Sequence, residues 1–375
     1  MQRFASLLCE GLTARGVRAT VVQPPVVLGR ASSIRPLAKW VGYTDKLLLF
    51  PRQLRQALGI RANGDIVVHI CDHSNALYLP WIRHLPHVVT CHDLLAVRAA
   101  RAEFEDVRTR WSGRQLQRAI LHGLRSASRI VCDSQATHSD LARVAGSSHR
   151  GTATIYPAVS PGFTEASRQP SQHRARSVLL RARPVNSRAH GSIAPGRYLL
   201  HVGGNQWYKN RSGLIAIYAA LVSADCGVPP LLLAGKPLPS ELRQEIDTRQ
   251  LGDRVFEVTD LEDADLAALY ASARLLLFPS LAEGFGWPVL EAMACGCRVV
   301  TSDRAPLTEV AMDAGTYIRP ESPVEAAGQI HAVLREPESV RALKVQAGLK
   351  RASHFTLDRM AGAYLDVYRG VLAAS

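Results

Sequence analysis

The chain has 375 residues, which is enough for two domains of ordinary size that bury their cores without disulfides or a structural metal. Its 47% apolar and 21% charged residues exclude wholesale disorder. The net charge of +13 favours an anionic partner, which leaves nucleic acid, an anionic membrane surface and a phosphorylated small molecule as candidates.

The first 16 residues have the spacing of an amphipathic helix that ends at Gly16. Its apolar residues are Phe4, Leu7, Leu8 and Leu12. A strand, Ala19–Gln23, is predicted directly after this helix, whereas a doubly wound domain usually begins with a strand and a glycine-rich turn. We therefore expect the first domain to lack its N-terminal strand and the natural chain to start some tens of residues earlier; a domain trimmed at this end is the alternative.

Short β-rich runs then recur along the chain, each followed by a turn and a helical pattern. In the first half these runs are Asp65–Cys71, His87–Cys91, Arg129–Cys132 and Ala153–Tyr156. In the second half they are Tyr198–Val202, Pro230–Ala234, Leu275–Phe278 and Arg298–Thr301. Unbroken Val, Ile and Leu runs that alternate with helices predict parallel strands buried on both faces. The fold class is therefore α/β, with one doubly wound sheet in each half.

These patterns divide the chain into four parts. Residues 1–166 are predicted to form the first domain and residues 198–345 the second. Residues 167–197 are rich in Arg, Ser and Pro and lack a periodic apolar pattern, so we expect a basic linker or a surface insertion there. Residues 346–375 have helical spacing and are expected to pack back across the domains.

The basic residues are concentrated in the first part of the chain. The net charge is +11 over residues 1–163, +6 over residues 164–197 and −4 over residues 198–375. One predicted amphipathic helix carries a cationic stripe. The stripe consists of Arg110, Arg114, Arg118 and Arg125. It is either a solvated helix face or a contact for anionic lipid headgroups. Nucleic acid is disfavoured, because aromatic residues make up only 6% of the chain and are not interleaved with basic runs.

The seven cysteines form no C-x-x-C pair and none has the spacing of a zinc site, so no metal is expected. They lie mostly in apolar runs, which is typical of reduced, buried thiols in a cytoplasmic protein. The longest apolar stretch, Leu214–Gly235, is interrupted by Asp225 and by two prolines. No membrane-spanning helix is predicted from it.

Polar and glycine residues follow the predicted strands at their carboxyl ends. They are Asp72–His73, His92–Asp93, Asp133–Ser134, Gly203–Asn205, Gly235–Lys236, Ser280–Glu283 and Ser302–Asp303. Ligands of open parallel α/β sheets bind at this edge of the sheet. Because both halves of the chain contribute such residues, we expect a ligand in a cleft between two domains.

The most informative segment runs from Pro279 to Cys297. A strand ends just before it, a loop with two glycines follows, Pro288 fits the first turn of a helix, and Gly296 fits its end. Loop amides at a helix N-terminus form an anion site that suits a diphosphate. Glu283 and Glu291 bracket this loop and have acceptors for sugar and ribose hydroxyls. The alternative is a capping acid at Glu283 and a surface helix residue at Glu291.

At this point the sequence resembles a known family. The segment Glu283–Glu291, EGFGWPVLE, is similar to the donor-site signature of the family-4 retaining glycosyltransferases, which have the GT-B architecture of two Rossmann-like domains facing each other across a cleft. Residues 198–210 resemble the first strand and phosphate loop of that family's C-terminal domain. His92, Ser134 and the segment Thr308–Val310 also fall where the family has them. The resemblance covers most of the chain.

The resemblance implies a role for each matching residue. As candidate catalytic residues, Glu283 would bind hydroxyls of the donor sugar, Lys209 would neutralise the departing diphosphate, and His92 would face the donor sugar from the first domain. Glu291 would bind the nucleotide ribose. The other candidate donor-binding residues are Gly203, Gly204, Asn205, Arg211, Gly284, Phe285, Gly286 and Trp287.

The sequence departs from the family pattern at one cation. The family commonly has an arginine a few residues before the lysine, where this chain has Gly204 and Asn205, and we expect Arg211 to stand in for it. Two simpler interpretations stay open: Lys209 is an ordinary surface lysine, or His92 only precedes a helix capped by Asp93.

The resemblance implies an enzyme that moves a hexosyl group from a nucleotide diphosphate sugar to an acceptor hydroxyl with retention of configuration, without a metal or cofactor. The acceptor would be a saccharide or lipid-linked, as in cell-surface polysaccharide or glycolipid synthesis, and the enzyme cytoplasmic, peripheral at the inner face of the membrane. The alternative is a catalytically impaired sugar-nucleotide-binding protein that lacks the N-terminal glycine-rich loop. A nicotinamide-dependent dehydrogenase is disfavoured, because no G-x-G-x-x-G motif with an acid about 20 residues later follows a strand.

Overall fold

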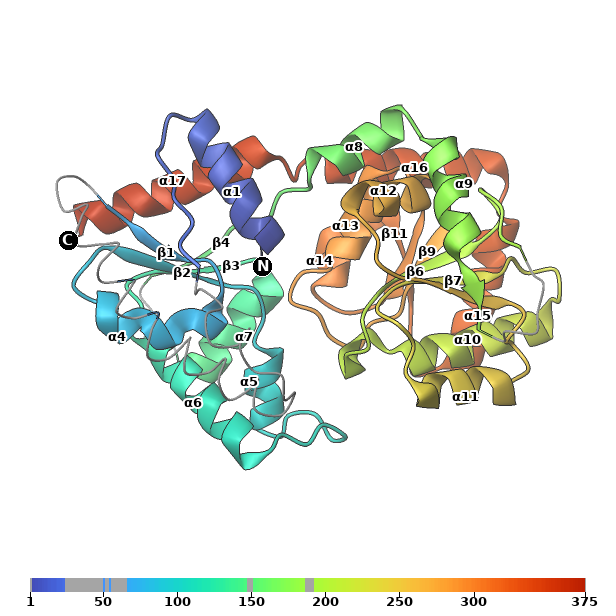
Figure 1. Ribbon diagram of the computed structural model, residues 1–375, viewed down its shortest axis with the longest axis horizontal. Coiled ribbons are helices and arrows are strands. Elements are labelled where there is room, and N and C mark those ends of the chain that lie inside the picture. Colours follow the sequence, from blue (N-terminus) through green and yellow to red (C-terminus); the bar gives the residue numbers. More distant parts are fainter. Residues whose placement is uncertain are drawn as a thin grey trace, which may run out of the picture. The chain divides into compact units, whose positions relative to one another are not determined.

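The structure, a computed structural model, describes residues 2–23, 50, 54, 66–146, 151–185 and 192–374. It forms two compact α/β units (Figure 1). The first unit contains residues 1–157 and 357–375, and the second contains residues 158–356. The second unit thus begins earlier than the predicted domain, and the last helix belongs to the first unit.

The first unit is built on a parallel sheet with the strand order β1-β2-β3-β4. Its strands are β1 (Val68–Ile70), β2 (His87–Cys91), β3 (Ile130–Cys132) and β4 (Thr152–Thr154). All residues of β2 and β3 are buried, as expected for strands covered on both faces. Strands β1, β2 and β3 lie within predicted β-rich runs, and β4 overlaps the predicted run Ala153–Tyr156.

The prediction of a strand at Ala19–Gln23 is wrong. Within the described residues this segment pairs with no strand, and Val21 and Val22 are 48% and 44% exposed. A β-rich run becomes a strand only where a neighbouring strand pairs with its backbone groups. The described ladder contains no such neighbour for these residues.

Helices cover both faces of the first sheet (Figure 1). They are α1 (Gln2–Ala14), η3 (His73–Tyr78), α4 (Leu79–Ile82), α5 (Leu95–Ala100), α6 (Trp111–Arg125), α7 (Gln135–Ala145) and α17 (Leu357–Ala373). Helix α1 buries the predicted stripe Phe4, Leu7, Leu8 and Leu12 and packs against α17. The prediction of an amphipathic N-terminal helix is confirmed.

Helix α17 is held on the first sheet by a polar network. His69 of β1 contacts the hydroxyls of Tyr368 and Thr90, each at 2.7 Å, and Thr90 contacts the hydroxyl of Tyr364 at 2.8 Å. Burial lowers the pKa of His69 to about 3, and the nearby His92 adds to that effect. Residues from the far end of the chain therefore complete the first unit.

The second unit is built on a larger sheet with the strand order β11-β10-β9-β6-β7-β8-β5. Its strands are β5 (Arg183–Pro184), β6 (Leu199–Gly203), β7 (Leu231–Gly235), β8 (Val255–Val258), β9 (Leu275–Phe278), β10 (Val299–Ser302) and β11 (Gly315–Ile318). All pairs are parallel except that of β5 with β8 at one edge. The four predicted strands are present, and β5, β8 and β11 were not predicted.

Helices also flank the second sheet. They are α8 (Pro161–Arg168), α9 (Gln172–Arg181), α10 (Arg211–Ala224), α11 (Ser240–Thr248), α12 (Asp263–Ser272), α13 (Trp287–Ala294), α14 (Leu307–Ala311), α15 (Pro323–Arg335) and α16 (Glu338–Ala352), with short 3-10 turns η4 (Trp207–Lys209) and η5 (Met312–Ala314). In the part of the chain described, no helix is long and apolar enough to cross a bilayer.

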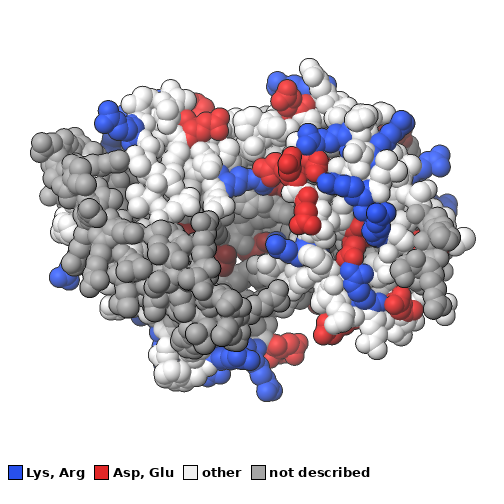
Figure 2. All heavy atoms as spheres, viewed as in Figure 1, with Lys and Arg blue, Asp and Glu red and all other residues white. Residues whose placement is uncertain are grey.

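The predicted linker 167–197 instead contains folded structure. Helix α9 buries Ala175, Val178 and Leu179. Two of its arginines, Arg174 and Arg181, lie 2.8 and 2.9 Å from the carboxylate of Asp265 on α12. Figure 2 shows blue and red side chains interleaved over the second unit, in keeping with such ion pairs. The arginines that suggested a solvated linker therefore attach a helix to the second unit.

Candidate functional site

The carboxyl ends of β6 and β7 lie side by side, with Gly203 paired to Gly235 in the strand register. Gly235 has φ of +131°, and a Cβ added to it would lie 2.2 Å from the carbonyl oxygen of Gly203. Only glycine fits this backbone without a shift. The two loops that follow these strands are thus brought close together at the edge of the sheet where ligands of this fold class bind.

Arg211, at the start of α10, ties these two loops to each other. Its guanidinium donates to the carbonyl oxygen of Gly203 at 2.8 Å, to that of Lys236 at 2.9 Å and to Oδ1 of Asn205 at 2.6 Å. Burial lowers the pKa of Arg211 to about 10, against the opposing charge of Glu257. Arg211, predicted to bind the donor, therefore holds the two loops in place, because its terminal nitrogens donate to oxygen atoms of these loops.

The next connection joins the start of α10 to the loop after β9. Asn210 has left-handed backbone angles and caps α10 by accepting from the amide of Gly213 at 3.2 Å. Its side-chain amide donates to the carbonyl oxygen of Pro279 at 3.0 Å, and the amide of Leu281 donates to the carbonyl oxygen of Tyr208 at 2.7 Å. These bonds bring the segment that carries Lys209 beside the loop that carries Glu283.

Lys209 and Glu283, predicted separately, form an ion pair of 2.7 Å. Their side chains are only 15% and 8% exposed. The Lys209 ammonium also lies 5.1 Å from the ring centre of Phe278 and 5.5 Å from that of Tyr208. A surface position for Lys209, the simpler interpretation, is therefore excluded.

His201 is a buried histidine on β6, the strand that precedes the Lys209 segment. Its Nδ1–H donates to the carbonyl oxygen of Leu277 at 3.1 Å and its ring stacks on Phe278. Burial, followed by the positive charge of Arg211, lowers the pKa of His201 to about 3. Lys209, rather than this histidine, thus supplies positive charge beside Glu283.

Helix α13 begins directly after the loop, as predicted. Gly286 is its N-cap residue with φ of +103°, Pro288 lies in its first turn, and Gly296 with φ of +72° follows its end. A Cβ at Gly286 would lie 2.7 Å from the Leu307 side chain. The positive end of the helix dipole therefore lies in the same loop as Glu283 and the predicted residues Gly284, Phe285 and Trp287.

Glu291 is a buried acid and not the surface helix residue of the alternative interpretation. Glu291 is 3% exposed, and the hydroxyl of Tyr270 on α12 donates to the Glu291 carboxylate at 3.1 Å. Burial and then the charge of Glu291 raise the pKa of Tyr270 well above its usual value. The sequence did not reveal Tyr270, because its only signal is a tyrosine within an otherwise apolar helix.

The remaining candidate, His92, lies in the first unit at the end of β2. Its Nδ1 is 2.5 Å from the carboxylate of Asp133 and its Nε2 is 2.7 Å from the carbonyl oxygen of Cys71. Asp93 does accept from the amide of Leu95 at 3.0 Å, so it acts as a local cap as the simpler interpretation held. His92 itself has specific partners from two other strand ends.

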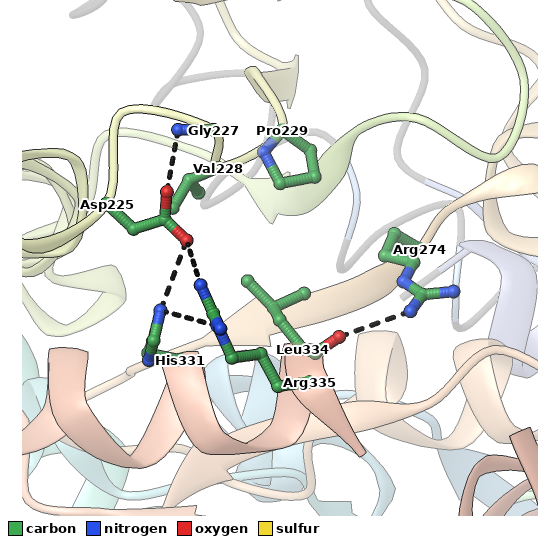
Figure 3. Close-up of a pocket in the computed structure, with 8 residues that line it drawn as sticks. All are labelled: Asp225, Gly227, Val228, Pro229, Arg274, His331, Leu334 and Arg335. Atoms are coloured by element: carbon green, nitrogen blue, oxygen red, sulfur yellow. Dashed lines mark hydrogen bonds and ion pairs between the residues drawn. The ribbon is translucent and has the colours of Figure 1, made fainter. Parts of the chain in front are cut away.

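A cavity of about 210 Å³ lies at the opposite edge of the second sheet, before β7 and β9 (Figure 3). There Asp225 lies 3.2 Å from both His331 and Arg335, and it accepts from the amide of Gly227 at 2.8 Å. Arg274 donates to the carbonyl oxygen of Leu334. The polar groups of this cavity are therefore paired with one another, away from the predicted site residues.

The chain is similar to glycosyltransferases over both units. The family model "Glycosyltransferase Family 4" matches residues 1–163, and "Glycosyl transferases group 1" matches residues 183–349. The O-antigen chain mannosyltransferase B of Escherichia coli is 28% identical over 324 residues, which is 86% of this chain and 78% of that protein.

Two solved structures share the fold. Sucrose-phosphate synthase from Thermosynechococcus elongatus has a TM-score of 0.72 at 21% identity, with 98% of this chain and 92% of that chain covered. HepE of Anabaena, solved in complex with UDP and glucose, has a TM-score of 0.69 at 17% identity, with 98% and 96% covered. The predicted fold of two Rossmann-like α/β domains, that of the GT-B enzymes, is confirmed.

Proposed function

Because this chain belongs to the family-4, group 1 glycosyltransferases, we propose that it transfers a hexosyl group from a nucleotide diphosphate sugar to an acceptor hydroxyl with retention of configuration. The observation that carries this proposal is the contact of Lys209 with Glu283 beside the N-terminus of α13. A cation, an acid and a positive helix end in one place suit a sugar joined to a diphosphate.

In the proposed reaction the bond between the anomeric carbon and the diphosphate oxygen breaks, and the acceptor oxygen bonds to that carbon. Retention requires the acceptor to approach the face that the diphosphate leaves, and the acceptor proton passes to a diphosphate oxygen. Lys209 and the start of α13 stabilise the charge that develops on the diphosphate. This role needs only fixed positive charge, and no proton donor on the protein.

Donor binding would exchange one partner of Lys209 for another. The ammonium turns from Glu283 to the diphosphate, and Glu283 then accepts hydrogen bonds from sugar hydroxyls. Both side chains are largely buried, so each needs a polar partner in both states, and this exchange supplies one to each. Glu291 with Tyr270 would hold the ribose, and the loops fixed by Arg211 would approach the phosphates.

The identity of the donor's sugar and nucleotide is tested by comparing candidate donors. The relative from Escherichia coli is a mannosyltransferase and the Anabaena structure holds UDP and glucose, so GDP-mannose and UDP-glucose are the first donors to compare. A donor at 100 times its dissociation constant raises the free energy of unfolding by about 2.7 kcal/mol, which a thermal-shift assay detects. Binding without transfer would favour a sugar-nucleotide-binding protein instead.

The site itself is tested by Lys209→Met, with Lys344→Met on α16 as the matched control. Loss of a cation at the leaving group lowers kcat at least tenfold. The Lys344 ammonium donates to the carbonyl oxygen of Asp313, outside the candidate site, and its loss leaves kcat unchanged. Equal rates for both variants would contradict the role of Lys209. Donor turnover is measured by release of the nucleoside diphosphate.

We also propose a saccharide or lipid-linked acceptor, polysaccharide or glycolipid synthesis, and peripheral binding to the inner face of an anionic membrane. The support is α6, whose predicted arginine stripe is exposed while Ile120, Leu121 and Leu124 are buried, and whose first residue, Trp111, is 74% exposed. Each basic residue near such a surface contributes about 1 kcal/mol. Charge reversal of Arg114 and Arg118 should abolish co-flotation with vesicles containing phosphatidylglycerol; unchanged flotation would refute this.

A further inference from the structure

His92 connects three strand ends of the first unit. It follows β2 directly, its Nδ1 contacts Asp133 after β3, and its Nε2 contacts the main-chain oxygen of Cys71 after β1. Its side chain is 8% exposed and that of Asp133 is 1% exposed. This arrangement places a histidine with both ring nitrogens bonded at the carboxyl edge of the sheet.

The two partners of His92 are both acceptors. A carbonyl oxygen has no proton to give, and an ionised carboxylate has none either. A neutral imidazole has one N–H and one lone pair, so it can satisfy only one of these two partners. With Asp133 ionised, two short contacts to two acceptors require both ring nitrogens to carry a proton, and the ring to be an imidazolium.

The surroundings of Asp133 support the same charge state. Its second oxygen, Oδ1, is buried and has no hydrogen-bond partner among the described residues, where His92 is the side chain that contacts this carboxylate. A buried carboxylate without an opposite charge would be strongly disfavoured. The pair is thus an anion and a cation held 2.5 Å apart away from solvent.

The other titratable groups that face His92 come from each neighbouring element. Asp72 and His73 follow β1, Asp93 follows β2, and His69 lies on β1 with a pKa lowered to about 3. From α1 the ring of Phe4 meets the His92 ring edge to face, with ring centres 4.9 Å apart. Burial opposes a charge on His92, but the charge and hydrogen bond of Asp133, the hydrogen bond to Cys71 and the charge of Asp72 together raise the pKa of His92.

We propose that Asp133 is a positioning residue that keeps His92 doubly hydrogen-bonded and positively charged, so that His92 serves the transferase as a fixed cation and not as a proton acceptor. The part that concerns turnover rests on the proposed function, whereas the charge state of His92 does not. A histidine that donates from both nitrogens has no lone pair with which to accept the proton of an acceptor hydroxyl.

The charge state is tested by NMR on the full chain labelled with ¹⁵N in its histidine rings. In the wild type at pH 7, both nitrogens of His92 should show protonated shifts. In Asp133→Asn the acid dissociation constant of His92 should rise at least tenfold. His138, whose nitrogens contact the hydroxyls of Thr152 and Thr154, is the internal reference. Asp140→Asn, which removes a carboxylate paired with Arg98 and Arg143, is the control variant and should leave His92 unchanged.

A wild-type His92 ring with only one protonated nitrogen at pH 7 would overturn the proposal. This measurement needs only the wild type, so it decides the question even if Asp133→Asn fails to fold. An unchanged titration of His92 in a folded Asp133→Asn variant would overturn it as well. For turnover, kcat/KM should fall as pH rises through the pKa of His92, and Asp133→Asn should move this fall to lower pH. A shifted titration with an unshifted rate profile would refute the cation role; no transfer by the wild type from any donor would refute the proposed function and leave the charge state established.

Discussion

The substitution Gly235→Ala tests whether the edge formed by β6 and β7 is as tightly built as the structure indicates. Gly235 ends β7 with φ of +131°, and the added Cβ would lie 2.2 Å from the carbonyl oxygen of Gly203. A residue other than glycine in such a backbone region costs about 1–3 kcal/mol. Moving backbone to relieve an overpacked contact costs about 1–3 kcal/mol more.

We therefore expect Gly235→Ala to lower the free energy of unfolding by about 4 kcal/mol. The matched control is Gly328→Ala in the middle of α15, where an added Cβ would have no atom of the described residues within 4 Å. Alanine in a helix interior is favoured over glycine by about 1 kcal/mol, so the control should gain stability. The same substitution, glycine to alanine, should thus lower the free energy of unfolding at position 235 and raise it at position 328.

Thermal denaturation monitored by circular dichroism measures both variants. A change of 1 kcal/mol shifts the Tm of a unit of this size by about 2–4 °C, so Gly235→Ala should melt roughly 8–16 °C below the wild type and Gly328→Ala slightly above it. Equal Tm values for Gly235→Ala and the wild type would show that the two loops have room to move. The edge formed by β6 and β7 would then not be fixed in place beside the proposed phosphate site.

Three further predictions follow from the contacts of the site. Tyr270→Phe removes the hydrogen bond to the buried Glu291, so it should lower the free energy of unfolding, measured by urea denaturation, by about 1.5–3 kcal/mol and weaken donor binding. The control is Tyr317→Phe, which removes a hydroxyl that donates to a backbone oxygen near the surface and should leave donor binding unchanged. Glu283→Gln keeps the size of the side chain but removes its charge, so Lys209 loses its ion pair. The KM for the donor should therefore change along with kcat, and kinetics identical to those of the wild type would contradict a coupling between Lys209 and Glu283. Finally, the raised pKa of His92 makes its ion pair stabilising below the unfolded value of about 6.5, and this contribution should be lost as pH rises through the folded pKa, which denaturant midpoints measured between pH 6 and 9 will show.

Much of the second unit was predictable from local patterns. The strands rich in Leu and Val, the glycine-bearing loop and the helix that starts at Trp287 and ends before Gly296 all have short-range signals. Strands β8 and β11 were missed because neither is an unbroken apolar run: β8 contains Glu257, and β11 begins with Gly315 and Thr316 and includes half-buried positions. Short strands of this kind are defined by their neighbours in the sheet rather than by their own sequence.

The error at 167–197 has a different cause. Ala175, Val178 and Leu179 are spaced as one face of a helix, but the surrounding arginines made the segment look like a solvated linker. Their partner Asp265 lies 91 and 84 positions away in the sequence. Charge density alone does not distinguish a solvated segment from one whose charges are paired by the fold.

The contacts between site residues could not be predicted from local sequence patterns either, because the partners are far apart in the sequence. Lys209 and Glu283 are 74 positions apart and His92 and Asp133 are 41 apart. The rule that parallel strands place their carboxyl ends at one edge did predict that these residues lie near each other within each sheet. It did not predict which of them touch, because that depends on loop conformations such as the left-handed backbone of Asn210.

The proposed activity is transfer of a sugar with retention of configuration at a site built around Lys209 and Glu283. It is tested most directly by ¹H NMR of the first glycosidic product formed from an α-linked nucleotide diphosphate sugar. We expect an α-linked product from the wild type and from Lys344→Met, and at least tenfold slower formation of it by Lys209→Met. A β-linked product would refute retention, and an undiminished rate in Lys209→Met would refute the role of Lys209.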